Sequence, residues 1–139
     1  MLTDQRRAKR AAQLIAMVGE GAKRKEYQAL IKGLPALIHQ AGLLQALAFL
    51  AAKAETDQPR EDATEEHALA LVHLAAMLAD AKLATTDNSL VDQCAGKGLI
   101  EYARTSREAV AGLGWLKRLS VATWGELGRS SSAFTGNPR

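Results

Sequence analysis

Residues 33–52 contain no lysine, arginine, aspartate or glutamate, although these four types make up 24% of the chain. An apolar run of this length, wound into one helix, is long enough to cross a bilayer. The run is GLPALIHQAGLLQALAFLAA, so Pro35 and Gly42 interrupt it, and His39, Gln40 and Gln45 would lack partners in lipid. It therefore predicts two short helical segments packed in a protein core, rather than a membrane span.

The rest of the chain also favours helices. Alanine, leucine and long charged residues dominate, whereas the β-branched and aromatic residues that strands prefer are sparse. The 139 residues contain a single cysteine, Cys94, which excludes an internal disulfide and suits a reducing cytoplasm. We therefore expect an all-α fold: a compact, single-domain bundle of about five to six helices over residues 1–124, followed by a disordered, flexible tail over residues 125–139.

Apolar residues at helical spacing predict where the helices lie. The expected ranges are 4–18, 23–41 with a kink or restart at Pro35, 43–54, 65–82, 89–102 and 105–124. Thr64 is expected to cap the helix that begins at residue 65. The stretch 85–88 is expected to form a turn and cap. Thr105 and Glu108 match the capping box, in which each side chain bonds to the backbone N–H of the other residue.

No group of residues forms a recognisable catalytic or metal site. His67 and His73 are six residues apart and do not share a helix face. His73 and Asp80 do share one, but two ligands are fewer than a stable metal site needs. Cys94 has no basic or histidine neighbour in the sequence to activate it. We therefore expect no catalytic residue, no metal and no cofactor, and a chain that is not an enzyme.

Charge is strongly segregated along the chain. Residues 1–32 carry a net charge of +5, residues 55–92 carry −7 and residues 93–139 carry +4. Basic clusters beside a separate acidic segment favour contact with a polyanion through phosphates. Aromatic residues are few, so nothing indicates readout of bases. The residues predicted to contact phosphates are Arg7, Arg10, Lys25, Lys32, Arg107, Lys117 and Arg118.

Two stretches resemble a known family, the small helical subunit of the type III-B CRISPR Cmr complex. The first, residues 25–53, is matched by a tyrosine, a Leu-Pro-x-Leu-Ile segment and a Gly-Leu pair before a leucine-rich run. These are Tyr27, Leu34, Pro35, Leu37, Ile38, Gly42, Leu43, Leu47, Ala48, Phe49 and Leu50. The second is matched by Thr105, Glu108, Trp115, Leu116, Lys117 and Arg118, and Arg7 and Ala8 match near the N-terminus. Ala41 departs from the pattern, because the family often has asparagine there.

The resemblance covers residues 5–123 and implies a non-catalytic subunit of an RNA-guided effector in antiviral defence. Such subunits stack head to tail along the interior of the complex, with a basic face toward CRISPR RNA paired with target RNA. The implied partners are the backbone subunit, the large subunit, further copies of this chain and both RNAs, in the cytoplasm and away from membranes. RNA contact is carried over residue by residue only for Lys117 and Arg118, which lie in the matched motif.

Two alternatives come from other classes of protein. The corner at residues 35–43 invites comparison with helix-turn-helix DNA-binding proteins, but the segment that would read bases, LLQALAFLAAK, is apolar. A helical adaptor protein would share the bundle and the segregated charge. A helical-bundle enzyme lacks the catalytic pair or ligand set that it would need.

Overall fold

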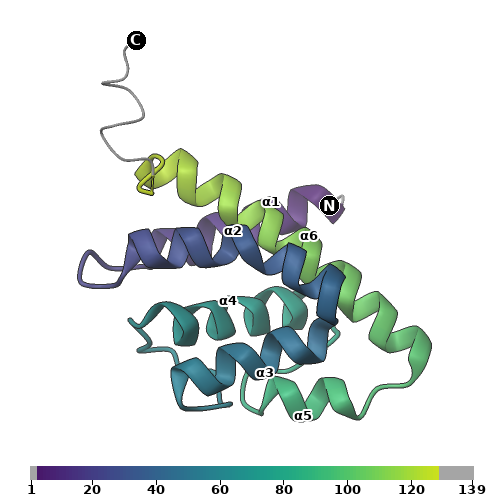
Figure 1. The fold of residues 1–139 in the computed structure, drawn as a ribbon. Helices are drawn as coiled ribbons and strands as arrows, with labels where there is room; N and C mark the ends of the chain where they lie inside the picture. Colours follow the sequence, from purple (N-terminus) through teal and green to yellow (C-terminus); the bar gives the residue numbers. More distant parts are fainter. Residues whose placement is uncertain (1–2, 129–139) are drawn as a thin grey trace.

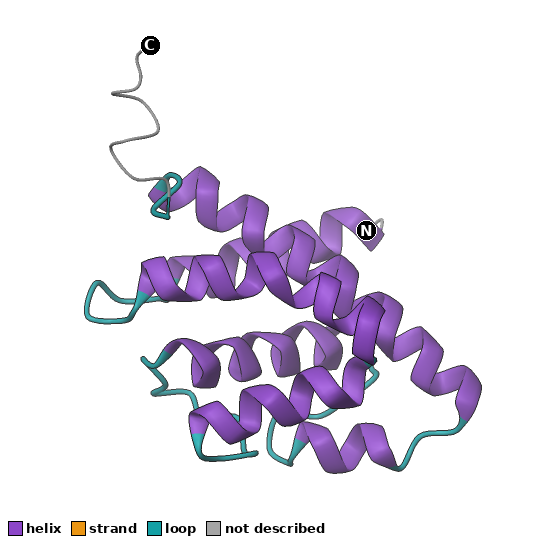
Figure 2. Ribbon diagram, in the orientation of Figure 1, coloured by secondary structure: helices purple, strands orange, loops and turns teal. Residues whose placement is uncertain are grey.

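A computed structural model describes residues 3–128, which fold into six helices with no strand among them. The helices are α1 (Thr3–Ala16), α2 (Arg24–Ala41), α3 (Leu43–Ala54), α4 (Glu66–Asp80), α5 (Leu90–Ala95) and α6 (Leu99–Trp124). Figures 1 and 2 show them as one bundle, with α6 crossing it diagonally. The predicted all-α bundle is confirmed.

The core forms where α4 and α6 meet the other helices. Helix α6 packs against α1, α2 and α4, while α4 also packs against α1, α2 and α3. Every residue of α4 from Leu69 to Leu78 is buried except Val72, as expected for a central helix. Gly112 of α6 lets α4 come close, because a Cβ at this position would lie 3.3 Å from Cβ of Met77.

Pro35 does not interrupt the helix, so of the predicted kink or restart the restart was wrong. Helix α2 continues through Pro35 to Ala41, and only Gly42, with φ of +94°, separates it from α3. A proline inside a helix removes one backbone hydrogen bond. Burial of Ile31, Leu34 and Ile38 along the inner face of α2 holds the helix together on both sides of that position.

Three predicted helix starts also need correction. The side chain of Glu65, rather than Thr64, caps α4 by accepting the N–H of Ala68 at 2.9 Å. Ser89, rather than the turn before it, caps α5 by accepting the N–H of Asp92 at 3.1 Å. The expected helix over 89–102 is divided, because α5 ends at Ala95 and α6 begins at Leu99 after the two weak helix formers Gly96 and Gly98.

Thr105 and Glu108 do not form a capping box, because both lie inside α6, well after its first residue. The Thr105 hydroxyl donates to the carbonyl of Glu101 at 2.8 Å, one turn earlier. The Glu108 carboxylate instead accepts hydrogen bonds from two arginines of α1. The local pattern was present, but packing against α1 gives Glu108 a different role.

The chain beyond α6 is anchored as far as Leu127. The Gln28 side chain of α2 donates to the carbonyl of Gly125 at 2.9 Å and accepts the N–H of Leu127 at 2.8 Å. The predicted tail therefore does not begin at residue 125, and its remainder, residues 129–139, lies outside the described residues.

Among the helices of residues 3–128, none combines the length and the apolar character that a membrane span requires.

Candidate nucleic-acid interface

A stripe of arginines follows the outward face of α6. Arg104, Arg107 and Arg118 are exposed, and Ala111 and Gly114 lie between them on the same face. The spacing of three, four, three and four residues keeps all five positions on one side of a helix. At 1.5 Å per residue the stripe is about 21 Å long. None of these five residues is acidic, although the Arg104 guanidinium lies 3.4 Å from the carboxylate of Glu101, one turn earlier. A polyanion laid along α6 from Arg107 to Arg118 meets positive charge next to small side chains. We call this set the α6 stripe.

One end of the α6 stripe opens into a hollow of about 430 Å³ between α1, α6 and the end of α4. We call this hollow the basic basin. Its charged lining residues are Arg6, Arg7, Lys82, Arg104, Arg107, Asp80 and Glu108. The five bases outnumber the two acids. Lys82 follows α4 with φ of +63°, beside helix-end carbonyls that favour a cation.

The Glu108 carboxylate fixes two of these arginines in place. Arg7 donates to it through Nε at 2.9 Å and Nη2 at 2.8 Å, and Arg6 donates through Nη2 at 3.2 Å. Arg6 also pairs with Asp80 at 3.1 Å. The hydrogen bond from Arg7 is the main reason that the pKa of Glu108 lies below its ordinary value, and Arg6 lowers it further. Arg6 and Arg7 therefore hold α1 against α6, and much of their charge is neutralised within the chain.

The other predicted RNA-binding residues lie in several places. Lys25 and Lys32 are exposed on α2, two turns apart and outside the basic basin. Arg10 is half-buried on α1 and donates to Gln13 at 3.4 Å. Lys117 is half-buried on α6, and the Arg118 guanidinium lies 4.8 Å from the ring centre of Trp115. Of the seven, only Arg7 and Arg107 line the basin.

Sequence reasoning missed three bases of this surface: Arg6, Lys82 and Arg104. Arg104 had a usable signal, because it lies three residues before Arg107 on the same helix face. Lys82 had none, because it lies in a segment of net negative charge and reaches the basin only through the packing of α4. A surface shared by three helices cannot be found from spacing within one of them.

The buried titratable side chains are arranged for packing. The Tyr27 hydroxyl and Nδ1 of His73 are 2.6 Å apart, with both residues buried. Burial, together with the charge of Arg10, lowers the pKa of His73 to about 4, so the imidazole is neutral at pH 7. Burial also raises the pKa of the Cys94 thiol, which disfavours the reactive thiolate. His73 does not join Asp80, which instead pairs with Arg6.

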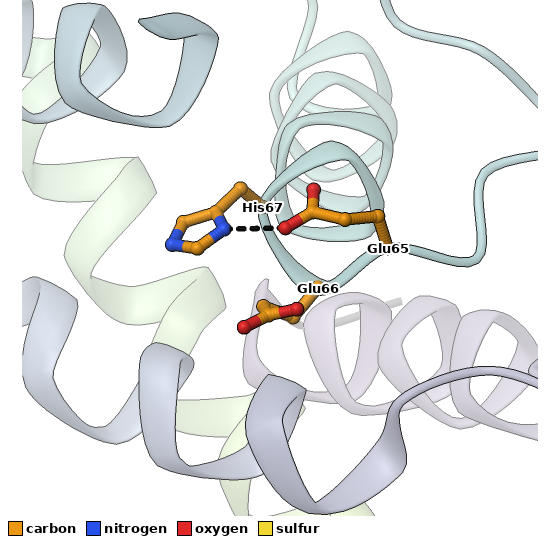
Figure 3. A group of neighbouring side chains, drawn as sticks. All are labelled: Glu65, Glu66 and His67. Atoms are coloured by element: carbon orange, nitrogen blue, oxygen red, sulfur yellow. Dashed lines mark hydrogen bonds and ion pairs between the residues drawn. The ribbon is translucent and has the colours of Figure 1, made fainter. Parts of the chain in front are cut away.

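Glu65, Glu66 and His67 at the start of α4 form the one group among residues 3–128 with ligand-type atoms within 4.8 Å of one another. Figure 3 shows Glu65 and His67 turned toward each other, and Glu65 Oε2 lies 2.6 Å from Nδ1 of His67. Burial favours a raised pKa for Glu65, but bonds from His67 and from backbone N–H groups lower it overall. Because Glu65 also caps α4, we interpret these three side chains as part of the helix N-terminus rather than as a metal site.

Comparison with known proteins gives concordant matches. The family model described as CRISPR-associated protein (Cas_Cmr5) matches residues 3–123. The chain is 30% identical over 115 residues to the "CRISPR system Cmr subunit Cmr5" of Thermus thermophilus, covering 83% of this chain and 90% of that protein. It also resembles the crystal structure of a CRISPR-associated Cmr5 family protein from the same organism. That match has a TM-score of 0.66 and 27% identity, and covers 88% of this chain and 97% of the other.

Proposed function

This chain belongs to the Cmr5 family, the small-subunit family of type III-B CRISPR Cmr complexes, and we propose that it serves there as a non-catalytic RNA-binding subunit. It would stack with further copies of itself beside the backbone and large subunits, in the cytoplasm. Its basic face would contact the phosphates of CRISPR RNA paired with target RNA. This role accounts for segregated charge on a bundle with no assembled catalytic group among the described residues.

The observation that carries the proposal is the α6 stripe, which continues into the basic basin. Arginines spaced along one exposed face, with alanine and glycine between them, let a phosphate backbone approach closely. Contacts of this kind bind nucleic acid without reading its sequence. Arg107 and Arg118 remain RNA contacts in this proposal, and Arg104 and Lys82 join them. Lys117 borders the stripe, and Lys25 and Lys32 would extend the contact along α2.

Arg7 and Arg10 have a weaker place in the proposal. Nε and Nη2 of Arg7 are already bonded to Glu108. Arg7 would therefore attract phosphates through its charge rather than bond to them directly. Arg10 lines a separate groove beside His73, away from the basin. We therefore rank both below the exposed arginines of α6 as RNA contacts.

The helix-turn-helix alternative has little support from α3, which would be its recognition helix. Leu43, Ala46, Leu47 and Leu50 face the core. A recognition helix needs several polar side chains aimed at base edges in the major groove. Among the exposed residues of α3, only Gln45 and Lys53 have polar side chains long enough to do this. A helical adaptor remains compatible, since a subunit that contacts its neighbours is one kind of adaptor.

Charge reversal on the α6 stripe tests the proposal. Arg104→Glu with Arg107→Glu should weaken binding of a short RNA duplex by about 10- to 100-fold, and should lower the slope of log affinity against log salt by about 1 to 2. Lys117→Glu with Arg118→Glu should act in the same direction. Fluorescence anisotropy over a salt series with the full chain, repeated on the reconstituted complex, measures both effects.

The matched control is Lys23→Glu with Arg60→Glu, which makes the same change in net charge at exposed positions outside the stripe and the basin. It should retain most of the affinity. If the control and stripe variants lost RNA affinity equally, the effect would come from net charge alone and not from the α6 stripe. Sequence-selective binding of duplex DNA at moderate salt would contradict the proposed function.

A further inference from the structure

Two apolar features of the surface have no partner among the described residues. The first is the pair Leu99 and Ile100, whose exposed fractions are 85% and 78%. They are the first two residues of α6 and protrude at the corner between α5 and α6. We call this pair the apolar knob. Large apolar side chains that are exposed together usually mark an interaction site.

The corner that carries the apolar knob is held firmly. The Lys97 ammonium donates to the carbonyl of Leu83 at 2.7 Å and lies 3.6 Å from Glu101. The Lys97 N–H also donates to the carbonyl of Cys94, a buried residue of α5. A fixed corner presents its side chains without the entropic cost of ordering a loose loop.

The second feature is a groove of about 620 Å³ between α1, α4 and the loop over residues 59–64. We call it the α1–α4 groove. Its apolar lining comes from Leu14, Met17, Val18, Leu69, Val72 and Ala76. Met17 is 80% exposed, whereas Leu14, Val18 and Leu69 are buried along the floor. The groove is therefore open on one side and apolar beneath.

The two features lie on different elements, toward opposite ends of the molecule. In Figure 1 the start of α6 lies at the lower right beside α5, and the α1–α2 loop that borders the groove lies at the left. A contact between such different surfaces on two copies is heterologous, so it leaves a free knob at one end and a free groove at the other. It extends into a row of subunits and does not stop at a pair.

The charges around the two features are opposite in sign. Residues 55–66, which border the α1–α4 groove, hold six acidic residues and one arginine. Residues 97–107, which carry the apolar knob, hold three basic residues and one acidic residue. Complementary potentials of this kind favour one orientation of approach and oppose knob-to-knob contact.

We infer that the apolar knob of one copy docks into the α1–α4 groove of a second copy of this chain, and that this contact builds the row of small subunits. The existence of a row of small subunits is part of the proposed function, on which this inference rests. The inference adds which two surfaces form the contact between neighbours. The acidic loop of one copy then faces the basic α5–α6 corner of the next. Arg104 and Arg107, at the start of the α6 stripe, supply part of the positive charge that faces the acidic loop, and the stripe from Ala111 to Arg118 is left available.

Complementing variants test the inference by sedimentation of the full chain over a concentration series. Leu99→Asp with Ile100→Asp removes the knob at the first turn of α6, where acids favour the helix dipole. Met17→Arg with Val72→Arg obstructs the groove. Each variant alone should be monomeric, with self-association about 100-fold weaker than wild type, as expected from losing burial of two large side chains. An equimolar mixture should form dimers only, because one intact knob meets one intact groove.

The control Ala29→Asp with Ala36→Asp matches the charge change of the knob variant at exposed positions of α2 and should associate like wild type. The milder Leu99→Ala with Ile100→Ala adds no charge and should also weaken association. It keeps the test valid if the aspartate variant fails to fold. A knob variant that associates like wild type, a mixture that stays monomeric, or a wild-type chain that is monomeric throughout would overturn the inference. Leu99→Ala with Ile100→Ala should keep its RNA affinity, and Lys117→Glu with Arg118→Glu should keep its self-association, so the two proposals fail separately.

Discussion

Replacing Glu108 by alanine is expected to destabilise the folded chain by about 3 kcal/mol, the lower part of the range for breaking a buried charge pair. Glu108 is 7% exposed and accepts from Arg6 and Arg7 across the interface of α1 and α6. Its removal leaves two half-buried guanidinium groups close together without their shared carboxylate. Chemical denaturation, followed by circular dichroism, measures the change in free energy of unfolding.

Glu101→Ala is the matched control, because Glu101 is an acid of the same helix with weaker pairs. Its carboxylate lies 3.4 Å from Arg104 and 3.6 Å from Lys97, and its side chain is 41% exposed. Surface pairs of this kind contribute about 0–1 kcal/mol. Equal losses in the two variants would show that the bonds to Arg6 and Arg7 add nothing to stability.

The stabilisation from Glu108 should also depend on pH in a defined direction. Its pKa is lower in the folded chain than the ordinary value of 4.5, because Arg7 and Arg6 bond to the charged form. The unfolded chain therefore takes up a proton first as the pH falls, so this stabilisation is complete above about pH 5 and is lost as the pH falls through the folded pKa. The stability difference between wild type and Glu108→Gln should be constant from pH 7 to about 5 and should shrink at lower pH. A difference that grows with acidification would contradict this assignment.

Replacing Gly112 by leucine is expected to cost about 3 kcal/mol, near the top of the usual range for overpacked cores. A Cβ at this position would already lie 3.3 Å from both Cβ and Cε of Met77, where α6 crosses α4. The rest of a leucine side chain has no room unless the two helices separate. Thermal and urea unfolding measure the loss.

Gly114 gives the contrast, two residues further along α6. A Cβ there meets only the Arg118 guanidinium, at an ordinary 3.7 Å. Gly114→Ala should therefore stabilise the chain by about 0.5–1 kcal/mol, because alanine loses less backbone freedom in a helix. If Gly112→Leu were tolerated as well as Gly114→Ala, the close approach of α4 and α6 would be wrong.

The helices could be predicted from sequence because their signal is local. Apolar spacing placed α1, α2 and α4 to within a few residues, and the uncharged run forms the second half of α2 and most of α3. Two of the failures came where packing against the rest of the fold decides the outcome. Thr105 and Glu108 fit a local cap motif, but the partner of Glu108 is Arg7, 101 residues earlier in the chain. Pro35 fits a local break, but buried neighbours on both sides keep α2 continuous.

The candidate site was harder to predict for the same reason. Basic clusters indicated a polyanion partner, and Arg107 lies on the surface that the proposal uses. The basic basin, however, combines Arg6 of α1, Lys82 after α4 and Arg104 of α6. Their convergence depends on helix packing that no spacing rule contains. Sequence alone also could not separate arginines held by Glu108 from arginines free to meet phosphate.

The two tryptophans lie in environments that give the chain separate intrinsic fluorophores. Trp124 packs edge-on to buried Tyr27, with the Arg24 guanidinium 4.9 Å from its ring centre, so its emission responds to separation of α6 from α2. Trp115 instead lies under the guanidinium of Arg118, at the edge of the α6 stripe. A ligand that draws Arg118 away changes the quenching of Trp115 alone. Single-tryptophan versions of the chain thereby distinguish loss of the bundle from occupancy of its basic face without any attached dye.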